Sequence, residues 1–233
     1  IVNLAMKPIC TKHEKIQVKG EISSYQWLQK FIMDAIHDTQ IDDERILGVG
    51  YALPAIIDES GTRIYGLHEE MDLPRSFYEI VKEWFPYPAV LCREAVCAGS
   101  AVANDLAIEG TVVYLNLSPS VGGAVIKNGE PMNLGINCRK GEFGHITLVP
   151  HGRQCFCGRK GCVNAYCSTD NLTALTGGDL SAFFEHLDGG IAEYVRIWEE
   201  YLDYLALTIH NLMTSFDEKF ILGGDLARYL SPY

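Results

Sequence analysis

The sequence predicts an α/β protein, and three observations favour this class. Strand-like and helix-like stretches alternate along the 233 residues. Hydrophobic residues make up 48% of the chain and charged residues 21%, which is the balance of an ordinary globular protein. Apolar residues over 191–216 recur at helical spacing and fit one core helix of about seven turns. Together they predict a packed core of strands and helices rather than a disordered or repetitive chain.

Several apolar runs have the length and composition of buried strands. The third and fourth runs are separated by only three residues, and Asn128-Gly129 after them is a turn signal. We therefore expect these two strands to be joined by a tight connection. The predicted strands span residues 46–53, 88–92, 111–117, 121–126 and 219–222.

Helical patterns fill the gaps over residues 25–36, 74–84, 95–107 and 191–216. The third of these is rich in Ala, Gly, Ser and Cys, so neighbouring backbones can approach it closely, as at a domain junction. We expect a boundary near Glu109-Gly110, which divides the chain into residues 1–109 and 110–233.

The charge balance bears on possible partners. Lys and Arg total 19 and Asp and Glu total 30, so the net charge is −11, and such a surface repels nucleic acid and anionic lipid. No apolar run approaches the roughly 18 residues of a membrane span, and residues 1–7 do not have the pattern of a signal peptide. We expect a cytoplasmic chain with reduced cysteines and no membrane partner.

The strongest chemical motif combines His145 with Cys155, Cys157 and Cys162. Three thiolates and one imidazole suit tetrahedral Zn²⁺, and four protein ligands leave no open position. The motif therefore predicts a structural zinc site rather than a catalytic one. The alternative is a set of free buried thiols with His145 as a polar core residue, and Cys167 is the least favoured ligand.

A carboxylate stands three residues before the predicted ligand histidine. Glu142 lies between Gly141 and Phe143-Gly144, and the glycines permit sharp backbone turns. If zinc holds one ring nitrogen of His145, the other is left for a partner. A carboxylate beside a fixed donor suits the recognition of vicinal hydroxyls. The alternative for Glu142 is a solvated loop charge.

The segment Gly141-Glu-Phe-Gly-His145, followed by Gly152-Arg-Gln-Cys-Phe-Cys-Gly-Arg-Lys-Gly-Cys162, resembles the signature of the ROK family of repressors, open reading frames and sugar kinases. Residues 48–58, 121–129 and 221–227 also resemble family segments. The resemblance implies an actin-like (ribonuclease H-like) two-lobed sugar-kinase fold, with a sugar in its cleft and ATP beside it in the kinases. The family's first phosphate loop and final helices are not found, so the chain looks truncated at both ends.

The resemblance also assigns the sugar side. It implies that Glu142 and His145 contact a pyranose such as glucose or an N-acetylhexosamine. Asn164 stands where the family has a second sugar-contacting Glu, and Ala55 replaces a glycine of the pocket floor. Arg93-Glu94 replaces the Asn-Asp pair of the family kinases, whose Asp acts as base, so Glu94 would be the catalytic base of a kinase.

The motifs on the ATP side depart further from the family. Residues 118–120 read Ser-Pro-Ser where the family has Gly-Thr-Gly, and Pro119 has no N–H to offer a phosphate. Asp225 adds a negative charge at the adenosine turn. We therefore expect a sugar-sensing regulator domain without kinase activity, whose DNA contact is made by a separate helix-turn-helix outside this chain.

Two alternatives remain open. One is an active hexose or N-acetylhexosamine kinase that uses Glu94 and Mg·ATP. The other is a family member with no working sugar site that acts only through assembly. The resemblance implies a homodimer or tetramer in each case.

Overall fold

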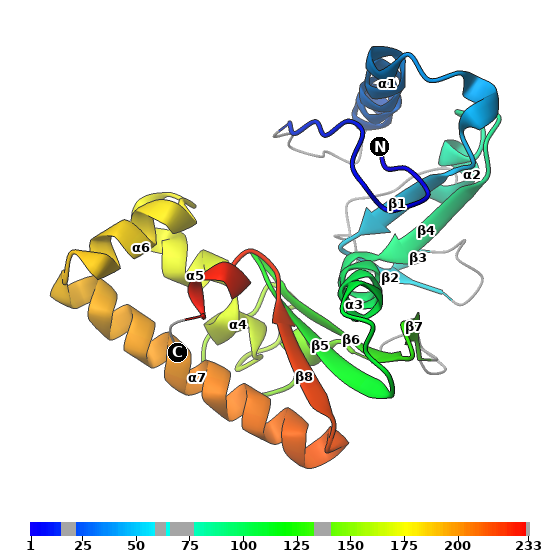
Figure 1. The fold of residues 1–233 in the computed structure, drawn as a ribbon. Coiled ribbons are helices and arrows are strands. Elements are labelled where there is room, and N and C mark those ends of the chain that lie inside the picture. The colour runs from blue at the N-terminus through cyan, green and yellow to red at the C-terminus, as the bar shows by residue number, and fades with distance from the viewer. Residues whose placement is uncertain (15–21, 59–63, 66–76, 133–140, 232–233) are drawn as a thin grey trace. The chain divides into compact units, whose positions relative to one another are not determined.

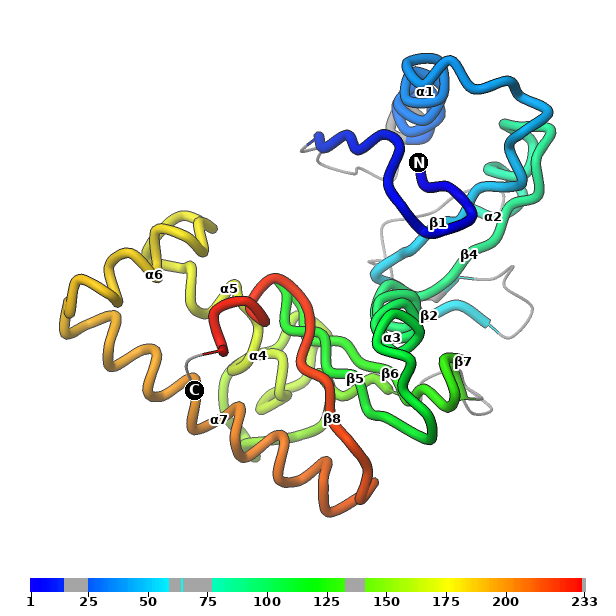
Figure 2. Tube along the Cα trace, viewed as in Figure 1, coloured from blue at the N-terminus to red at the C-terminus, as the bar shows by residue number. Residues whose placement is uncertain are grey.

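The computed structural model describes residues 1–14, 22–58, 64–65, 77–132 and 141–231. The chain divides into two compact units, Ile1–Glu94 and Ala95–Tyr233. The sequence prediction places the boundary later, near Glu109-Gly110, whereas contacts group the helix of residues 95–105 with the second unit. Figures 1 and 2 show the course of the chain through each unit.

Over its described residues, the first unit contains two small sheets and two α-helices (Figure 1). Strand β1 pairs in parallel with β4, and β2 pairs antiparallel with β3. The core is formed by buried apolar and aromatic side chains, namely Tyr25, Tyr51, Ile57, Phe77, Val81 and Leu91. The elements are α1 (Ile22–Thr39), the 3-10 turn η1 (Asp43–Arg45), β1 (Val49–Leu53), β2 (Ile56–Ile57), β3 (Ile64–Tyr65), α2 (Phe77–Val81) and β4 (Ala89–Arg93).

The second unit is built on a four-stranded sheet with the order β7-β6-β5-β8. Strand β8 runs parallel to β5, and the other neighbours are antiparallel. The elements are α3 (Glu94–Asp105), β5 (Thr111–Leu117), β6 (Val121–Lys127), β7 (Glu130–Pro131), η2 (Phe143–His145), α4 (Asn164–Cys167), α5 (Thr169–Thr173), η3 (Ala174–Thr176), α6 (Leu180–Asp188), α7 (Ala192–Phe216), β8 (Lys219–Gly223) and η4 (Ala227–Tyr229).

The long helix α7 shares one core with this sheet. Its buried positions include Trp198, Leu205 and Leu212, which recur at the spacing of one helical face. The strands contribute Val113, Leu115 and Leu117, all fully buried. The predicted helix over 191–216 is thus present almost residue for residue. Among the described residues, no helix is both long and apolar enough to cross a membrane.

The sheet brings together two segments that are distant in sequence. The register pairs Leu117 with Val121, so residues 118–120 form the predicted tight connection between β5 and β6. Strand β8 lies on the other side of β5, and the Leu226 N–H donates to the Leu117 carbonyl oxygen at 3.1 Å. The turn after β8 therefore lies beside the 118–120 turn.

Some predicted and observed features differ. Helix α6 is not among the predicted helices, although Asp179 accepts a hydrogen bond from the Ala182 N–H as an N-cap. Within the predicted helix of 74–84, the described α-helix α2 covers Phe77–Val81, and residues 74–76 lie outside the described residues.

Candidate metal centre and neighbouring polar groups

The short turn η2 is seated against β6 by two glycines. A Cβ atom at Gly144 would overlap the Val121 carbonyl oxygen, and one at Gly123 would overlap the Phe143 ring. Because neither position has room for a side chain, the turn approaches the strand closely. This packing places Glu142 and His145, at the two ends of the turn, beside the start of β6.

Residues 145–162, which we call the metal loop, are held mainly by their own backbone. The Leu148 N–H donates to the Gly161 carbonyl at 2.7 Å, and the Gly161 N–H donates to the Arg153 carbonyl at 2.8 Å. Gly161 has a φ of +80°, and a Cβ there would overlap the Val149 carbonyl oxygen. A side chain at position 161 would therefore require the loop to shift away from the Val149 carbonyl.

The closed loop gathers the four predicted ligands. The ligand atoms of His145, Cys155, Cys157 and Cys162 all lie within 4.8 Å of one another. His145 Nδ1 is 3.8 Å from Cys155 Sγ, and Cys157 Sγ is 3.7 Å from Cys162 Sγ. Tetrahedral zinc with Zn–S bonds of about 2.3 Å has S–S edges of about 3.8 Å. The donor set and its spacing fit a closed zinc site.

The electrostatics of the thiols also suit a cation. Burial raises the pKa of Cys162 to about 12 and raises the pKa of Cys155. Burial opposes ionisation of Cys157 as well, but hydrogen bonds from the Arg159 backbone and the neighbouring thiols lower its pKa to about 7. Metal ligation requires thiolates, so a bound dication would supply the charge compensation that the buried sulfurs need.

The imidazole of His145 has two different sides. Its Nδ1 faces the cysteines, whereas its Nε2 lies 4.0 Å from Glu142 Oε2. The Arg159 guanidinium donates to the His145 carbonyl oxygen at 2.9 Å and so ties the turn to the metal loop. The side chains of Glu142 and His145 are 26% and 22% exposed, so both reach solvent. A carboxylate and a ring nitrogen thus stand together at an accessible point.

Asn164 belongs to the same neighbourhood, but its side chain is engaged by the protein. Its Oδ1 accepts a hydrogen bond from the Val121 N–H at 2.6 Å, and the residue is 5% exposed. Asn171 Nδ2 donates to the backbone carbonyl of Asn164 at 3.1 Å. The amide that replaces the family's Glu therefore anchors β6, with its carbonyl oxygen already paired.

The remaining predicted site residues belong to the first unit. Leu53 pairs with Arg93 in the parallel β1–β4 register, so Ala55 and Glu94 follow strands that end at the same edge. Ala55 and Arg93 are buried, whereas Glu94 is exposed at the first position of α3. The structure thus brings these three predicted residues to one sheet edge.

The two turns that correspond to the family's ATP-side motifs bond to each other. Ser118 Oγ accepts a hydrogen bond from the Asp225 backbone N–H at 3.3 Å, and the Ser118 carbonyl accepts from the Thr169 N–H at 2.9 Å. Ser118 is 8% exposed, whereas Pro119 is exposed. The Ser118 hydroxyl, at a position where the family motif has glycine, thus accepts a hydrogen bond from a backbone N–H of the neighbouring turn.

The sequence patterns above do not predict a hollow between the metal loop, α5 and α7. Arg153 contributes to its lining from within the cysteine motif. On α7, Arg196, Glu200 and Tyr204 line it at four-residue spacing, which places them on one helical face. That spacing is the signal in the sequence that indicates a shared surface.

Comparisons with known proteins identify the family of this chain. A model of the ROK family matches residues 9–229. The N-acetylmannosamine kinase of Citrobacter koseri is 29% identical over 146 residues, covering 60% of this chain and 50% of the kinase. The xylose repressor of Bacillus subtilis is 26% identical over 161 residues, covering 65% of this chain and 41% of the repressor. The chain thus spans about half the length of the kinase.

A solved structure supports the fold. A ROK family glucokinase from Streptomyces griseus, in complex with glucose and AMPPNP, superposes with a TM-score of 0.71 at 20% identity. The match covers 86% of this chain and 72% of the glucokinase chain. The predicted α/β fold of the actin-like sugar-kinase type is confirmed.

Proposed function

The chain belongs to the ROK family, and we propose that it is the sugar-binding part of a regulator without kinase activity. The observation that carries this proposal is the bond between Ser118 Oγ and the Asp225 N–H. A phosphate site of this kind needs free backbone N–H groups, and Pro119 in the 118–120 turn has none. The Asp225 N–H, in the turn that resembles the family's adenosine turn, is taken by the Ser118 hydroxyl. The pair of Glu142 and His145, by contrast, remains accessible.

Glu142 and His145 support the sugar half of the proposal. In our proposal zinc is held by the metal loop and fixes the His145 ring through Nδ1, so that Nε2 is directed toward the sugar. The Glu142 carboxylate accepts from a vicinal pair of hydroxyls. The substrate class is a hexose or N-acetylhexosamine, and DNA contact comes from a separate helix-turn-helix in an oligomer of such chains.

A kinase is the second candidate, and the names of the relatives favour it. N-acetylmannosamine kinase and N-acetyl-D-glucosamine kinase are both similar to this chain. In this reading Glu94, which is exposed at the start of α3, is the base that takes the proton from a sugar hydroxyl. Mg·ATP is then the second substrate, and the departures at residues 118–120 weaken its binding without abolishing it.

Sugar binding is tested by isothermal titration of the zinc-loaded chain with glucose, N-acetylglucosamine, N-acetylmannosamine and xylose. We expect one sugar to bind and Glu142→Ala to weaken it about 10- to 150-fold, because a charge-assisted hydrogen bond of about 1.5–3 kcal/mol is lost. Glu218→Ala removes an exposed carboxylate of the same unit and serves as the control. Equal affinity for the two variants contradicts a sugar site at Glu142.

Kinase activity is tested separately, by following sugar phosphate formation from Mg·ATP over time. The regulator proposal expects no product above the rate without protein. If product appears and Glu94→Gln abolishes it, the kinase is the correct reading. Zinc content is measured in the unaltered chain and in Glu94→Gln, so that loss of zinc from the metal loop is not mistaken for loss of a catalytic base.

A further inference from the structure

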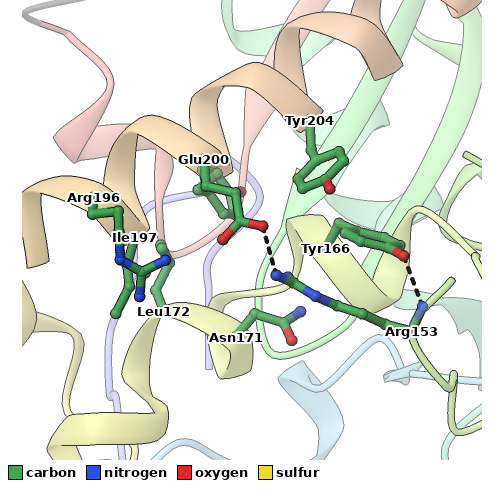
Figure 3. Close-up of a pocket in the computed structure, with 9 residues that line it drawn as sticks. Arg153, Tyr166, Asn171, Leu172, Arg196, Ile197, Glu200 and Tyr204 are labelled. Carbon is green, nitrogen blue, oxygen red and sulfur yellow. Dashed lines mark hydrogen bonds and ion pairs between the residues drawn. The ribbon is translucent and has the colours of Figure 1, made fainter. Parts of the chain in front are cut away.

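The hollow of the second unit introduced above is lined by none of the predicted sugar contacts, although Asn171 in its lining donates to the backbone carbonyl of Asn164. It is lined by the metal loop, α5 and α7 and has a volume of about 290 Å³, the size of a small-molecule site (Figure 3). Its apolar lining comes from Leu172 and Ile197 together with tyrosine rings. Its polar lining consists of Arg153, Asn171, Arg196 and Glu200.

One side of the hollow is a fixed pair of charges. The Arg153 guanidinium donates to Glu200 Oε1 at 2.8 Å and lies 4.8 Å from the centre of the Tyr166 ring. Tyr166 is fixed as well, because its hydroxyl accepts from the Arg153 backbone N–H at 2.7 Å. Figure 3 shows Arg153 extended along this wall toward Glu200. The carboxylate of the hollow is therefore already neutralised by a protein cation.

Arg196 is the third charged residue of the lining, and it is not part of the Arg153–Glu200 pair. Arg196 lies one helical turn before Glu200 on α7, and its side chain descends toward Leu172 in Figure 3. Among the described residues, the Arg196 guanidinium has no hydrogen bond or ion pair. The lining thus carries two guanidinium groups against one carboxylate, a local excess of positive charge on a chain whose net charge is −11.

We propose that this hollow binds a small organic anion, whose carboxylate or phosphate group is held by Arg196 and whose flat or apolar body packs on Ile197 and Leu172. A guanidinium presents its N–H groups in a planar fork that matches both kinds of oxyanion. A cation is disfavoured because Glu200 is already bonded to Arg153.

The test is isothermal titration of the zinc-loaded chain with benzoate and with phenyl phosphate. Inorganic phosphate, neutral benzyl alcohol and cationic benzamidine serve as comparison probes. We expect at least one aromatic anion to bind, Arg196→Ala to weaken it by about tenfold or more, and Arg196→Lys to weaken it less. Arg45→Ala removes an exposed arginine of the first unit and is the charge-matched control.

The probes distinguish a carboxylate ligand from a phosphate ester, and they show whether the aromatic ring contributes to binding. Tighter binding of benzoate assigns a carboxylate ligand, and tighter binding of phenyl phosphate assigns a phosphate ester. The proposal is overturned if neither anion binds at low millimolar concentration, if benzamidine binds better than both, or if Arg196→Ala and Arg45→Ala bind the anions equally. Circular dichroism of each variant shows that the fold is retained.

Discussion

The metal loop and the 118–120 turn belong to the same unit, yet they direct their polar groups differently. In the metal loop the backbone bonds to itself through Leu148, Arg153 and Gly161, so that sulfur and imidazole side chains are left to face a common point. In the turn, the backbone and hydroxyl of Ser118 both bond to other segments of the unit. The metal loop thus leaves its candidate ligand atoms facing one another, whereas the Ser118 oxygens accept hydrogen bonds from N–H groups of other segments.

The difference follows from where glycine is present. Gly161 allows the metal loop to close against the Val149 carbonyl, where no side chain fits. At position 118 a side chain is present, and its hydroxyl accepts the Asp225 N–H. Glycine at the close approach lets the metal loop gather its sulfur and imidazole groups, whereas the serine side chain at position 118 bonds to the neighbouring turn. Three substitutions test this contrast.

The largest effect is expected for Cys157→Ser. Serine is a poor zinc ligand, and structural zinc sites contribute on the order of 10 kcal/mol to folding in small zinc domains. We expect the variant to lose most of its zinc and to melt at a markedly lower temperature. Metal analysis and thermal unfolding measure the two effects. Cys10→Ser, in the first unit, is the control and is expected to keep its zinc.

Should Cys157→Ser fail to fold, chelation of the unaltered chain gives the same information. A strong chelator is expected to lower the melting temperature, and added Zn²⁺ is expected to restore it. A chain purified without chelator that contains no zinc, or a melting temperature that chelation leaves unchanged, contradicts the metal site.

An intermediate effect is expected for Gly161→Ala, with Gly158→Ala as its matched control. The two glycines have φ values of +80° and +82°, so an alanine at either position pays a similar backbone cost of about 1–2 kcal/mol. A Cβ at Gly161 would overlap the Val149 carbonyl oxygen, whereas a Cβ at Gly158 has nothing within 4 Å. We expect Gly161→Ala to cost about 1–3 kcal/mol more in unfolding free energy by denaturant titration. Equal costs would show that the loop tolerates a shift at Gly161.

Much of this architecture is readable from the sequence because its signals are local. The β5–β6 hairpin and α7 follow from apolar runs and helical spacing, and the candidate metal ligands follow from short intervals between Cys and His. The bonds of Asn164 to Val121 and of Ser118 to Asp225 span 43 and 107 residues. No spacing rule predicts such partners, because they depend on how the sheet and its turns pack.

The smallest effect is expected for Ser118→Ala. The change removes the acceptor of a 3.3 Å hydrogen bond, and the Asp225 N–H that loses it belongs to an exposed residue, so water replaces the partner. We expect a loss of about 0.5–1.5 kcal/mol in unfolding free energy. Freeing this single N–H does not create a phosphate site, because Pro119 still lacks a donor and the Asp225 carboxylate still repels phosphate. Titration with Mg·ATP in the presence of sugar is therefore expected to give no measurable heat for either protein. Micromolar binding by the unaltered chain would show that the Ser118–Asp225 hydrogen bond does not prevent nucleotide binding. It would favour the kinase over the regulator.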